Sequence, residues 1–266
     1  MRPEPGAVPD PAPVLAAPPA AVAVAELPEY LEKTYWWAYL RRPSIWIFDH
    51  NLTVSAILWG QYRKLVRAAL DEVKPGEHVL QMACVYGDLS RCIARKVGPD
   101  GRLDIIDVAS IQVENARGHL APFPWARASI ANAATPGPEK YDVVLCYFLL
   151  HEMPDDQKQR VVDTALERLN PEGRAVFIDF HRPSRWHPLR PVQALVFALL
   201  EPFAARLWRI QIPELSSQPR RFLWSKNTMF GGFFQKLVAT PAVALQERRL
   251  CNVHVSNQPG QWRSGA

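Results

Sequence analysis

The chain has 266 residues, 48% of them hydrophobic, which suffices for one sizeable α/β core and gives no case for two full domains. Its net charge of +5 suits anionic lipid, nucleotide phosphates or nucleic acid alike. The cysteines lack paired spacing and no secretory leader is recognised, which disfavours a zinc site or a disulfide framework and favours a reducing compartment. They are Cys84, Cys92, Cys146 and Cys251.

The first segment, residues 1–25, holds seven prolines among Ala and Val, and Arg2 is its only basic residue. This composition predicts a disordered tail and not an Arg-rich transit peptide. An aromatic cluster follows between Glu29 and Trp46. We expect it to form an N-terminal helical lid, either simply packed on the domain or acting at an active site or a membrane interface.

Alternating helical and strand patterns come next. Apolar residues recur at helical spacing over 62–73, and Lys74-Pro75-Gly76 ends that helix before a buried strand over 78–83. Further along, the pattern predicts helix 88–96, strand 103–108, helix 111–120, strand 125–130, strand 141–148, a helix capped by Asp155, a turn at 170–173 and strand 175–180. Alternating units of this kind imply an α/β, Rossmann-like domain over residues 26–240 with a mostly parallel, doubly wound sheet.

The pattern changes after Phe180, where basic residues precede an apolar run over 192–200 that is too short to span a bilayer. We expect 182–215 to be a membrane-facing insertion, and the alternative is that the same apolar face packs on the core. A closing antiparallel hairpin is predicted over 221–238, turning at Gly231-Gly232, with 241–266 as a C-terminal extension.

The first β-α turn, Gln81 to Asp88, is where a Rossmann-like fold approaches the polar part of its ligand. This region resembles class I S-adenosylmethionine (SAM) methyltransferases, whose turn reads acid-x-Gly-x-Gly-x-Gly, although only Gly87 is kept here. Asp107, about 20 residues later at a strand end, is placed to bind the ribose hydroxyls or, alternatively, to cap a helix. The residues expected around the cofactor are Gln81, Ala83, Val85, Tyr86, Gly87, Asp107, Asn132 near the adenine edge (or as a simple turn residue) and Phe148.

Gln81 stands where that family has an acid close to the ammonium group of the bound methionine moiety. A carboxylate about 4 Å away is worth roughly 1 to 4 kcal/mol, so its absence lowers the pKa of the amine by roughly 1 to 3 units. The nitrogen would then be nucleophilic, and Val85 and Tyr86 would displace the amino-acid end of the cofactor. A degenerate methyltransferase is the alternative that these substitutions leave open.

Six segments carry a more specific resemblance: YLEKTYWWAYL, AILWGQYRKL, VLQMACVYGDLS, FLLHEMP, DFHRPSRWHPLR and FGGFFQKLV. Together, over residues 29–240, they resemble the rhodoquinone biosynthesis (RquA) family. That family is related to quinone methyltransferases but replaces a methoxy group of ubiquinone with an amino group from SAM, with manganese implicated. The resemblance implies ubiquinone in the membrane and an anionic lipid surface as partners, and a cytoplasmic protein bound peripherally to the inner face of the membrane.

Four polar residues follow the last two core strands: His151 and Glu152 after the fourth, and Asp179 and His181 at the end of the fifth. We expect all four to gather at the ligand-binding edge, where a general base and a donor to a quinone oxygen are needed. They could also form a nitrogen and oxygen site suited to manganese, but spacing does not identify metal ligands. Structural hydrogen bonds are the alternative role.

Two other functions remain open from the sequence. One is a conventional methyltransferase of a quinone or phenol, and the other is a cofactor-binding regulatory or assembly subunit. No basic stripe with interleaved aromatic residues lies on the core elements, so nucleic acid is not an expected partner.

Overall fold

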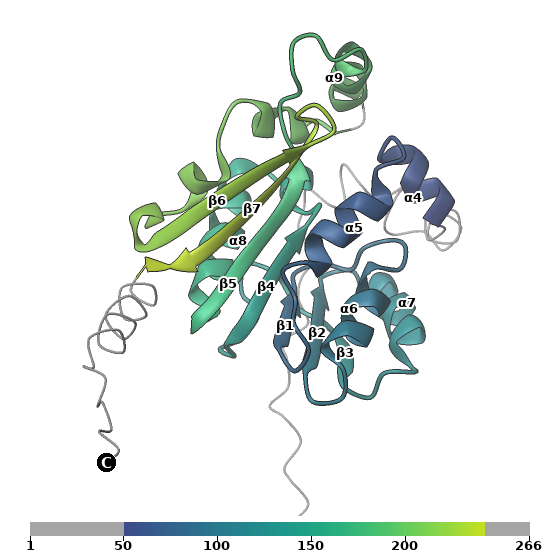
Figure 1. Cartoon of the computed structure of the whole chain (residues 1–266), viewed down its shortest axis with the longest axis vertical. Helices are drawn as coiled ribbons and strands as arrows, with labels where there is room; N and C mark the ends of the chain where they lie inside the picture. Colours follow the sequence, from purple (N-terminus) through teal and green to yellow (C-terminus); the bar gives the residue numbers. More distant parts are fainter. Residues whose placement is uncertain (1–50, 200, 243–266) are drawn as a thin grey trace, which may run out of the picture.

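The computed structural model describes residues 51–199 and 201–242, which form one seven-stranded sheet with helices on both faces (Figure 1). The strand order is β3-β2-β1-β4-β5-β7-β6. The strands are β1 (His78–Gln81), β2 (Arg102–Asp107), β3 (Ala126–Ile130), β4 (Tyr141–Tyr147), β5 (Leu169–Phe180), β6 (Phe222–Met229) and β7 (Phe234–Pro241). The first five pair in parallel, and the β6–β7 hairpin pairs antiparallel to β5. The predicted fold class, including its closing hairpin, is confirmed.

Helices cover the two faces in two groups (Figure 1). On one face lie α5 (Tyr62–Leu70), α6 (Leu89–Val97) and α7 (Ser110–Leu120), and on the other lies α8 (Asp155–Glu167). Around them are α4 (Asn51–Ile57), α9 (Arg190–Leu199) and the short 3-10 helices η1 (Leu150–Glu152), η2 (Ala204–Trp208), η3 (Ile212–Leu215) and η4 (Pro219–Arg221). The central strand β4 is buried on both faces, which is why its sequence reads as one apolar run.

Helix α5 illustrates how the pattern produces these layers. Tyr62, Leu65 and Ala69 recur at helical spacing and are all buried against the sheet. Arg63 and Arg67 lie between them in sequence and are exposed. The helix therefore buries one apolar stripe and leaves its charges in water, as an amphipathic surface helix does.

Two local predictions need correction. Asp155 is the first residue of α8, Pro154 occupies the N-cap position, and no side chain makes a capping hydrogen bond there. The predicted turn at 170–173 lies inside β5, where the register shifts between Tyr141 and Val143 of β4. Backbone pairing with Tyr141 outweighs the turn tendency of this segment, so the residues form a bulge.

The sequence left open whether the apolar face of the insertion after β5 packs on the core. In the structure, most of that face is exposed. Val192, Leu195 and Leu199 of α9 are 43%, 59% and 71% exposed, whereas Gln193 and Phe197 are buried. Pro191 is accommodated because it lies in the first helical turn. None of the helices described here is long and apolar enough to cross a membrane. The predicted tail, the aromatic lid over 29–46 and almost all of the extension after 241 lie outside the described residues.

Gly173 gives a test of the bulge. A Cβ atom at this position would lie 2.8 Å from the carbonyl oxygen of Tyr141, closer than real Cβ contacts allow. We expect Gly173→Ala to lower the free energy of unfolding by about 1 to 3 kcal/mol, because β5 must shift against β4. Urea denaturation measures this, with Gly118→Ala as the matched control. Gly118 is helical with no atom near its Cβ position, so that change should stabilise by about 0.5 to 1 kcal/mol.

Candidate active site

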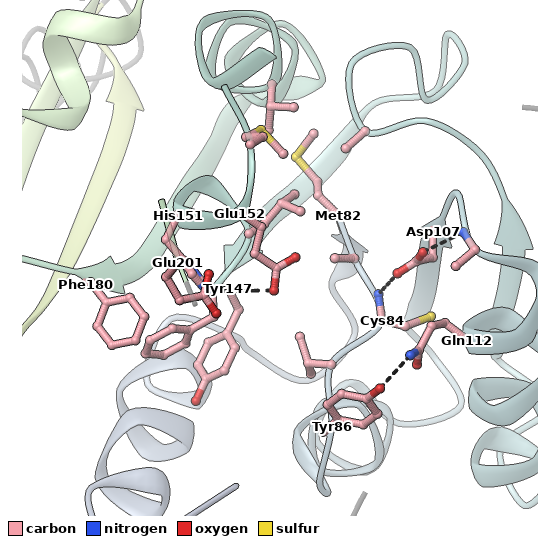
Figure 2. Close-up of a pocket in the computed structure, with 18 of the residues that line it drawn as sticks. Met82, Cys84, Tyr86, Asp107, Gln112, Tyr147, His151, Glu152, Phe180 and Glu201 are labelled. Atoms are coloured by element: carbon pink, nitrogen blue, oxygen red, sulfur yellow. Dashed lines mark hydrogen bonds and ion pairs between the residues drawn. The ribbon is translucent and has the colours of Figure 1, made fainter. Parts of the chain in front are cut away.

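A cavity of about 600 Å³ opens at the carboxyl ends of β1, β2 and β4 (Figure 2). In open parallel sheets, ligands bind at this edge, next to the point where successive strands stop adding on one side and start adding on the other. Here that point is β1, which lies between β2 and β4. Figure 2 shows two groups of polar side chains, with Cys84, Asp107 and Gln112 on one side and His151 and Glu152 on the other. The cavity therefore has two halves, one at the β1 turn and one at the β4 exit.

The turn after β1 contributes most of its residues to the first half. Ala83, Val85 and Tyr86 line the cavity, and the Tyr86 hydroxyl accepts a hydrogen bond of 2.8 Å from Nε2 of Gln112. Gly87 lies outside this lining and has a φ of 91°, a conformation that favours glycine. The one retained glycine therefore shapes the turn, while larger side chains take the positions nearest the ligand.

Gln81 was expected beside the cofactor, but it does not line the cavity. Its side chain is buried, with Nε2 donating to the Ala83 carbonyl oxygen at 2.7 Å and Oε1 accepting from the Ser90 hydroxyl at 3.0 Å. A glutamate could not donate the first of these bonds. The amide is thus part of the turn itself. Because it is uncharged and does not line the cavity, it would neither contact a bound amine nor raise the pKa of that amine as a carboxylate would.

Asp107 lies at the end of β2 and lines the cavity. Its Oδ2 accepts from the Cys84 backbone at 2.8 Å and its Oδ1 from the Ala109 backbone, also at 2.8 Å. Burial raises the pKa of this carboxyl to about 6, although the backbone N–H groups of Ala109 and Cys84 oppose the rise. Asp107 therefore holds the segment between β2 and α7 in place and presents a carboxylate to the cavity at neutral pH, but it is not the cap of α7, because Ala109 is the N-cap and no side chain caps that helix.

Asn132 has the local turn role that the sequence left open, and it also lies at the cavity. It lines the cavity, and its Oδ1 accepts a hydrogen bond of 2.8 Å from the backbone N–H of Ala134. The side-chain oxygen is thus engaged in a local turn, which fixes where the amide group stands.

Asp179 holds residues of the second half of the cavity in position, although it is itself buried behind the cavity wall. This carboxylate is 1% exposed and does not line the cavity. It accepts hydrogen bonds from the backbone N–H groups of Leu150 at 2.9 Å, His151 at 3.3 Å and Phe180 at 2.7 Å. Its Oδ1 also lies 3.0 Å from Nδ1 of His151. Asp179 is therefore a positioning residue that holds the His151 ring, and not a group in contact with ligand.

His151 is the side chain that Asp179 holds at the cavity. Burial lowers the pKa of this histidine, but Asp179, Glu201 and Glu152 raise it more, to about 9. Its Nε2 lies 3.7 Å from Oε1 of Glu152, which also lines the cavity. The ring is thus a buried imidazolium at neutral pH, suited to donate a hydrogen bond and unsuited to act as a base.

Glu201 was not predicted as a site residue, yet it lines the cavity on the same side as His151 (Figure 2). It follows α9, about 50 residues beyond His151 and outside the alternating β-α pattern. A lone glutamate after an apolar run gives no sequence signal for a catalytic role. The path of the chain after α9 is what brings it to the site.

His181 lies apart from the other three predicted residues. It does not line the cavity, and its Nδ1 lies 2.9 Å from the Gly232 carbonyl oxygen. Its backbone N–H also donates to Phe233, so the β6–β7 hairpin captures the residue. Burial lowers the pKa of His181, with a further contribution from Lys226, whose Nζ lies 3.0 Å from Nε2.

Aromatic residues form the wall between the two halves. Phe148 lines the cavity with a φ of 50°, an uncommon value for a large side chain, and its ring contacts Tyr147 and His151 edge-on. The Tyr147 hydroxyl is buried and has no hydrogen-bond partner within the described residues. A buried hydroxyl without a partner costs free energy of folding.

Helices α4 and α9 close the cavity from outside the sheet. Val54 and Ile57 of α4 line it, as do Gln193 and Val196 of α9. The two helices are connected through Trp59, whose Nε1 donates to Oε1 of Gln193 at 2.8 Å. Part of the cavity wall is thus apolar and comes from helices outside the sheet.

Manganese has no ready site here. Across the described ranges, no group of three or more His, Cys, Asp and Glu side chains is arranged to hold a metal ion. A protonated His151 is also a poor ligand, because metal binding requires neutral imidazole. We therefore derive no step through a metal.

The raised pKa of His151 gives a pH test. Because its folded pKa of about 9 exceeds the ordinary 6.5, the stabilisation is full below pH 6.5 and is lost as pH rises through 9. A shift of this size is worth roughly 3 kcal/mol. We expect the difference in free energy of unfolding between the parent and His151→Gln to shrink by that amount across this range. His78→Gln, at an exposed position opening β1, is the control, and a pH-independent difference for His151 would contradict the assignment.

Comparison with known proteins agrees with this geometry. Residues 79–173 match the methyltransferase domain family. The chain is 26% identical to a 2-phytyl-1,4-naphtoquinone methyltransferase of Trichormus variabilis over 56% of its length and 67% of the relative. It is 30% identical to the ubiquinone/menaquinone biosynthesis C-methyltransferase UbiE of Hahella chejuensis, over 51% of this chain and 56% of the relative.

Solved structures show the fold. The mitomycin 7-O-methyltransferase MmcR aligns with a TM-score of 0.58 at 16% identity, covering 79% of this chain and 61% of that one. The pyocyanin biosynthetic protein PhzM aligns with a TM-score of 0.57 at 14% identity, covering 79% and 62%. The chain therefore has the class I SAM methyltransferase fold, and over its first β-α units it is similar to SAM-dependent quinone methyltransferases.

Proposed function

We propose that this protein is a SAM-dependent transferase acting on the ring of ubiquinone, and that it replaces a ring methoxy group with an amino group, as in rhodoquinone biosynthesis. The observation that carries the proposal is the composition of the active-site cavity. Its first half has a neutral, bulky turn where a methyltransferase has an acid and glycines, and its second half has an imidazolium flanked by two carboxylates.

The first half of the cavity suits the adenosine part of SAM. The Asp107 carboxylate retains lone pairs for the two ribose hydroxyls, and Phe148 offers an apolar ring face for adenine or quinone. Ala83 and Val85 stand at the two positions where the methyltransferase motif has glycine, and both line the cavity together with Tyr86. The methionine end of the donor would consequently lie closer to the His151 half, where its nitrogen can approach a second substrate.

The second half suits a quinone ring. Tyr147, Phe148 and Phe180 give it an apolar, aromatic wall. Addition of a nitrogen to the ring places negative charge on a quinone oxygen, and the His151 imidazolium would donate a charge-assisted hydrogen bond to it. Asp179 holds the ring of His151 in place for that bond.

Glu152 and Glu201 supply the proton acceptor that the amine needs. As the C–N bond forms, one nitrogen-bound proton passes to a carboxylate. As the C–O bond to the methoxy group breaks, that proton leaves with the methoxy oxygen as methanol. The bond from nitrogen to its own carbon skeleton must break afterwards. The α hydrogen and its electron pair would pass to the quinone ring, giving an imine on a hydroquinone, and water would hydrolyse this imine to the amino-substituted hydroquinone and a 2-oxo acid.

Conventional methyl transfer is the second candidate, and the similarity to proteins named as quinone methyltransferases favours it. It uses the same cofactor half but moves the methyl carbon from sulfur to the ring or to a ring oxygen. A cofactor-binding subunit without turnover is the third.

Doubly labelled SAM, with nitrogen-15 in the amine and carbon-13 in the methyl group, separates these functions. We expect short-chain ubiquinone incubated with the purified protein to gain nitrogen-15 and lose a methoxy group, as read by mass spectrometry. Carbon-13 in the quinone would establish the methyltransferase instead, and binding without product would establish the subunit. His151→Gln should lower the rate about 10- to 100-fold, because the charged donor to the oxygen is lost.

The assignment of Asp107 is tested through binding. We expect Asp107→Asn to weaken SAM binding by about 1 to 3 kcal/mol in calorimetry, because a charge-assisted acceptor for the ribose hydroxyls is lost. Affinity of the parent protein should also fall as pH drops below about 6, where this carboxyl becomes protonated. Asp100→Asn, at an exposed turn, should leave both results unchanged. Equal affinity for the parent and Asp107→Asn would remove this residue from the cofactor site.

A further inference from the structure

Helix α9 stands at one end of the sheet and meets the rest of the protein along only part of its circumference (Figure 1). At about 100° per residue, its positions divide into four faces. Gln193 and Phe197 point into the body of the protein and are buried, and Gln193 and Val196 line the active-site cavity on one flank. Two further faces remain, the outward face and the opposite flank.

The outward face is an apolar ridge formed by Val192, Leu195 and Leu199, which are spaced at i, i+3 and i+7. Their exposed fractions are 43%, 59% and 71%. Trp186, in the loop before the helix, is 78% exposed, with the Arg185 guanidinium 4.6 Å from the centre of its ring. Large apolar side chains gathered on one exposed face, next to an exposed tryptophan, are typical of a surface that meets another apolar phase.

The opposite flank of α9 borders a second cavity, of about 380 Å³, which is separate from the active site. Arg182, Arg190 and Arg209 line it together with Trp208. Within the described residues, none of these three guanidinium groups forms an ion pair. We name this cavity the arginine pocket.

The charge of the arginine pocket indicates what it binds. Three guanidinium groups that form no ion pair within the described residues line this one cavity. Each guanidinium group offers several N–H donors in a planar fork, which fits a phosphate with several acceptor oxygens.

We propose that α9 is the membrane-docking surface of this protein, and that the arginine pocket binds the phosphate of an anionic phospholipid headgroup. With the ridge inserted among the acyl chains, both flanks of the helix lie at headgroup depth. The lipid phosphate then occupies one flank, and the active-site cavity opens on the other. The protein would thus sit peripherally on the inner face of the membrane.

The ridge argues for a lipid and against a free phosphate compound. A soluble phosphate would use the arginine pocket but would leave Leu195 and Leu199 in water, whereas a bilayer accounts for both features. The surface does not depend on which group the active site transfers. Vesicle binding therefore tests it without any measurement of turnover.

The test is sedimentation with phosphatidylcholine vesicles that contain or lack phosphatidylglycerol. We expect binding of the parent protein to require phosphatidylglycerol and to weaken with salt. Changing Arg182, Arg190 and Arg209 to Gln should reduce binding on the order of 100-fold, because each basic residue near an anionic surface contributes about a fivefold factor. The matched control changes Arg95, Arg160 and Arg220 to Gln, which removes the same charge from exposed positions elsewhere. SAM binding serves as the check that each variant is folded.

Two single variants separate the parts of the surface. Arg190→Lys keeps the charge but removes the planar fork of donors, so it should weaken binding severalfold and leave the salt dependence unchanged. Leu195→Ser should weaken binding to the same vesicles without altering the affinity for inorganic phosphate in calorimetry.

Three results would overturn the proposal. The arginine variant could sediment as fully as the parent protein, or the control variant could lose as much binding as the arginine variant. In either case the arginine pocket has no special role at the lipid surface. If inorganic phosphate binds in an arginine-dependent way while vesicles do not bind, the pocket serves a soluble phosphate compound and α9 is no docking surface.

Discussion

The hydrogen bonds of the buried Asp179 carboxylate hold together the second half of the cavity, the half that contains His151. Asp179 is 1% exposed at the end of β5, and a carboxylate in such surroundings is tolerated only when its oxygens are satisfied. Backbone N–H groups from Leu150, His151 and Phe180 and the His151 ring supply the partners. The carboxylate thereby fixes the exit of β4 to the end of β5, and it makes His151 a cation in a place that burial alone would keep neutral.

The cofactor half is built on a similar device. Asp107, at the end of β2, accepts from the backbone of Cys84 in the β1 turn and of Ala109 at the start of α7. Gln81 supports the same turn from behind through Ala83 and Ser90. Because the turn is held by these side chains, it can dispense with two of the glycines that a methyltransferase uses there. The turn therefore carries Ala83 and Val85, two residues with side chains, at positions that line the cavity.

The sequence predicted the fold almost completely, because the signals were local and periodic. Apolar residues at helical spacing identified α5 and α8, and the apolar run of β4 identified a doubly buried strand. The turn tendency of Asn170 to Gly173 misled the assignment of β5, since pairing with β4 overrides local preference there. Asp107 could be assigned because its spacing from the turn is a property of the β-α-β unit.

The composition and order of the side chains by themselves determined a parallel Rossmann-like sheet, a β1 turn without its usual acid and glycines, and two polar residues after β4. The tertiary structure decided which of the candidates share a cavity. It brought Glu201 to His151 from 50 residues away, placed Asp179 behind His151, and removed His181 to the β6–β7 hairpin. It also turned the apolar face of α9 outward. The spacing of apolar residues indicates that one face of a helix is apolar. Whether that face packs on the core or remains exposed depends on how the other elements pack around the helix.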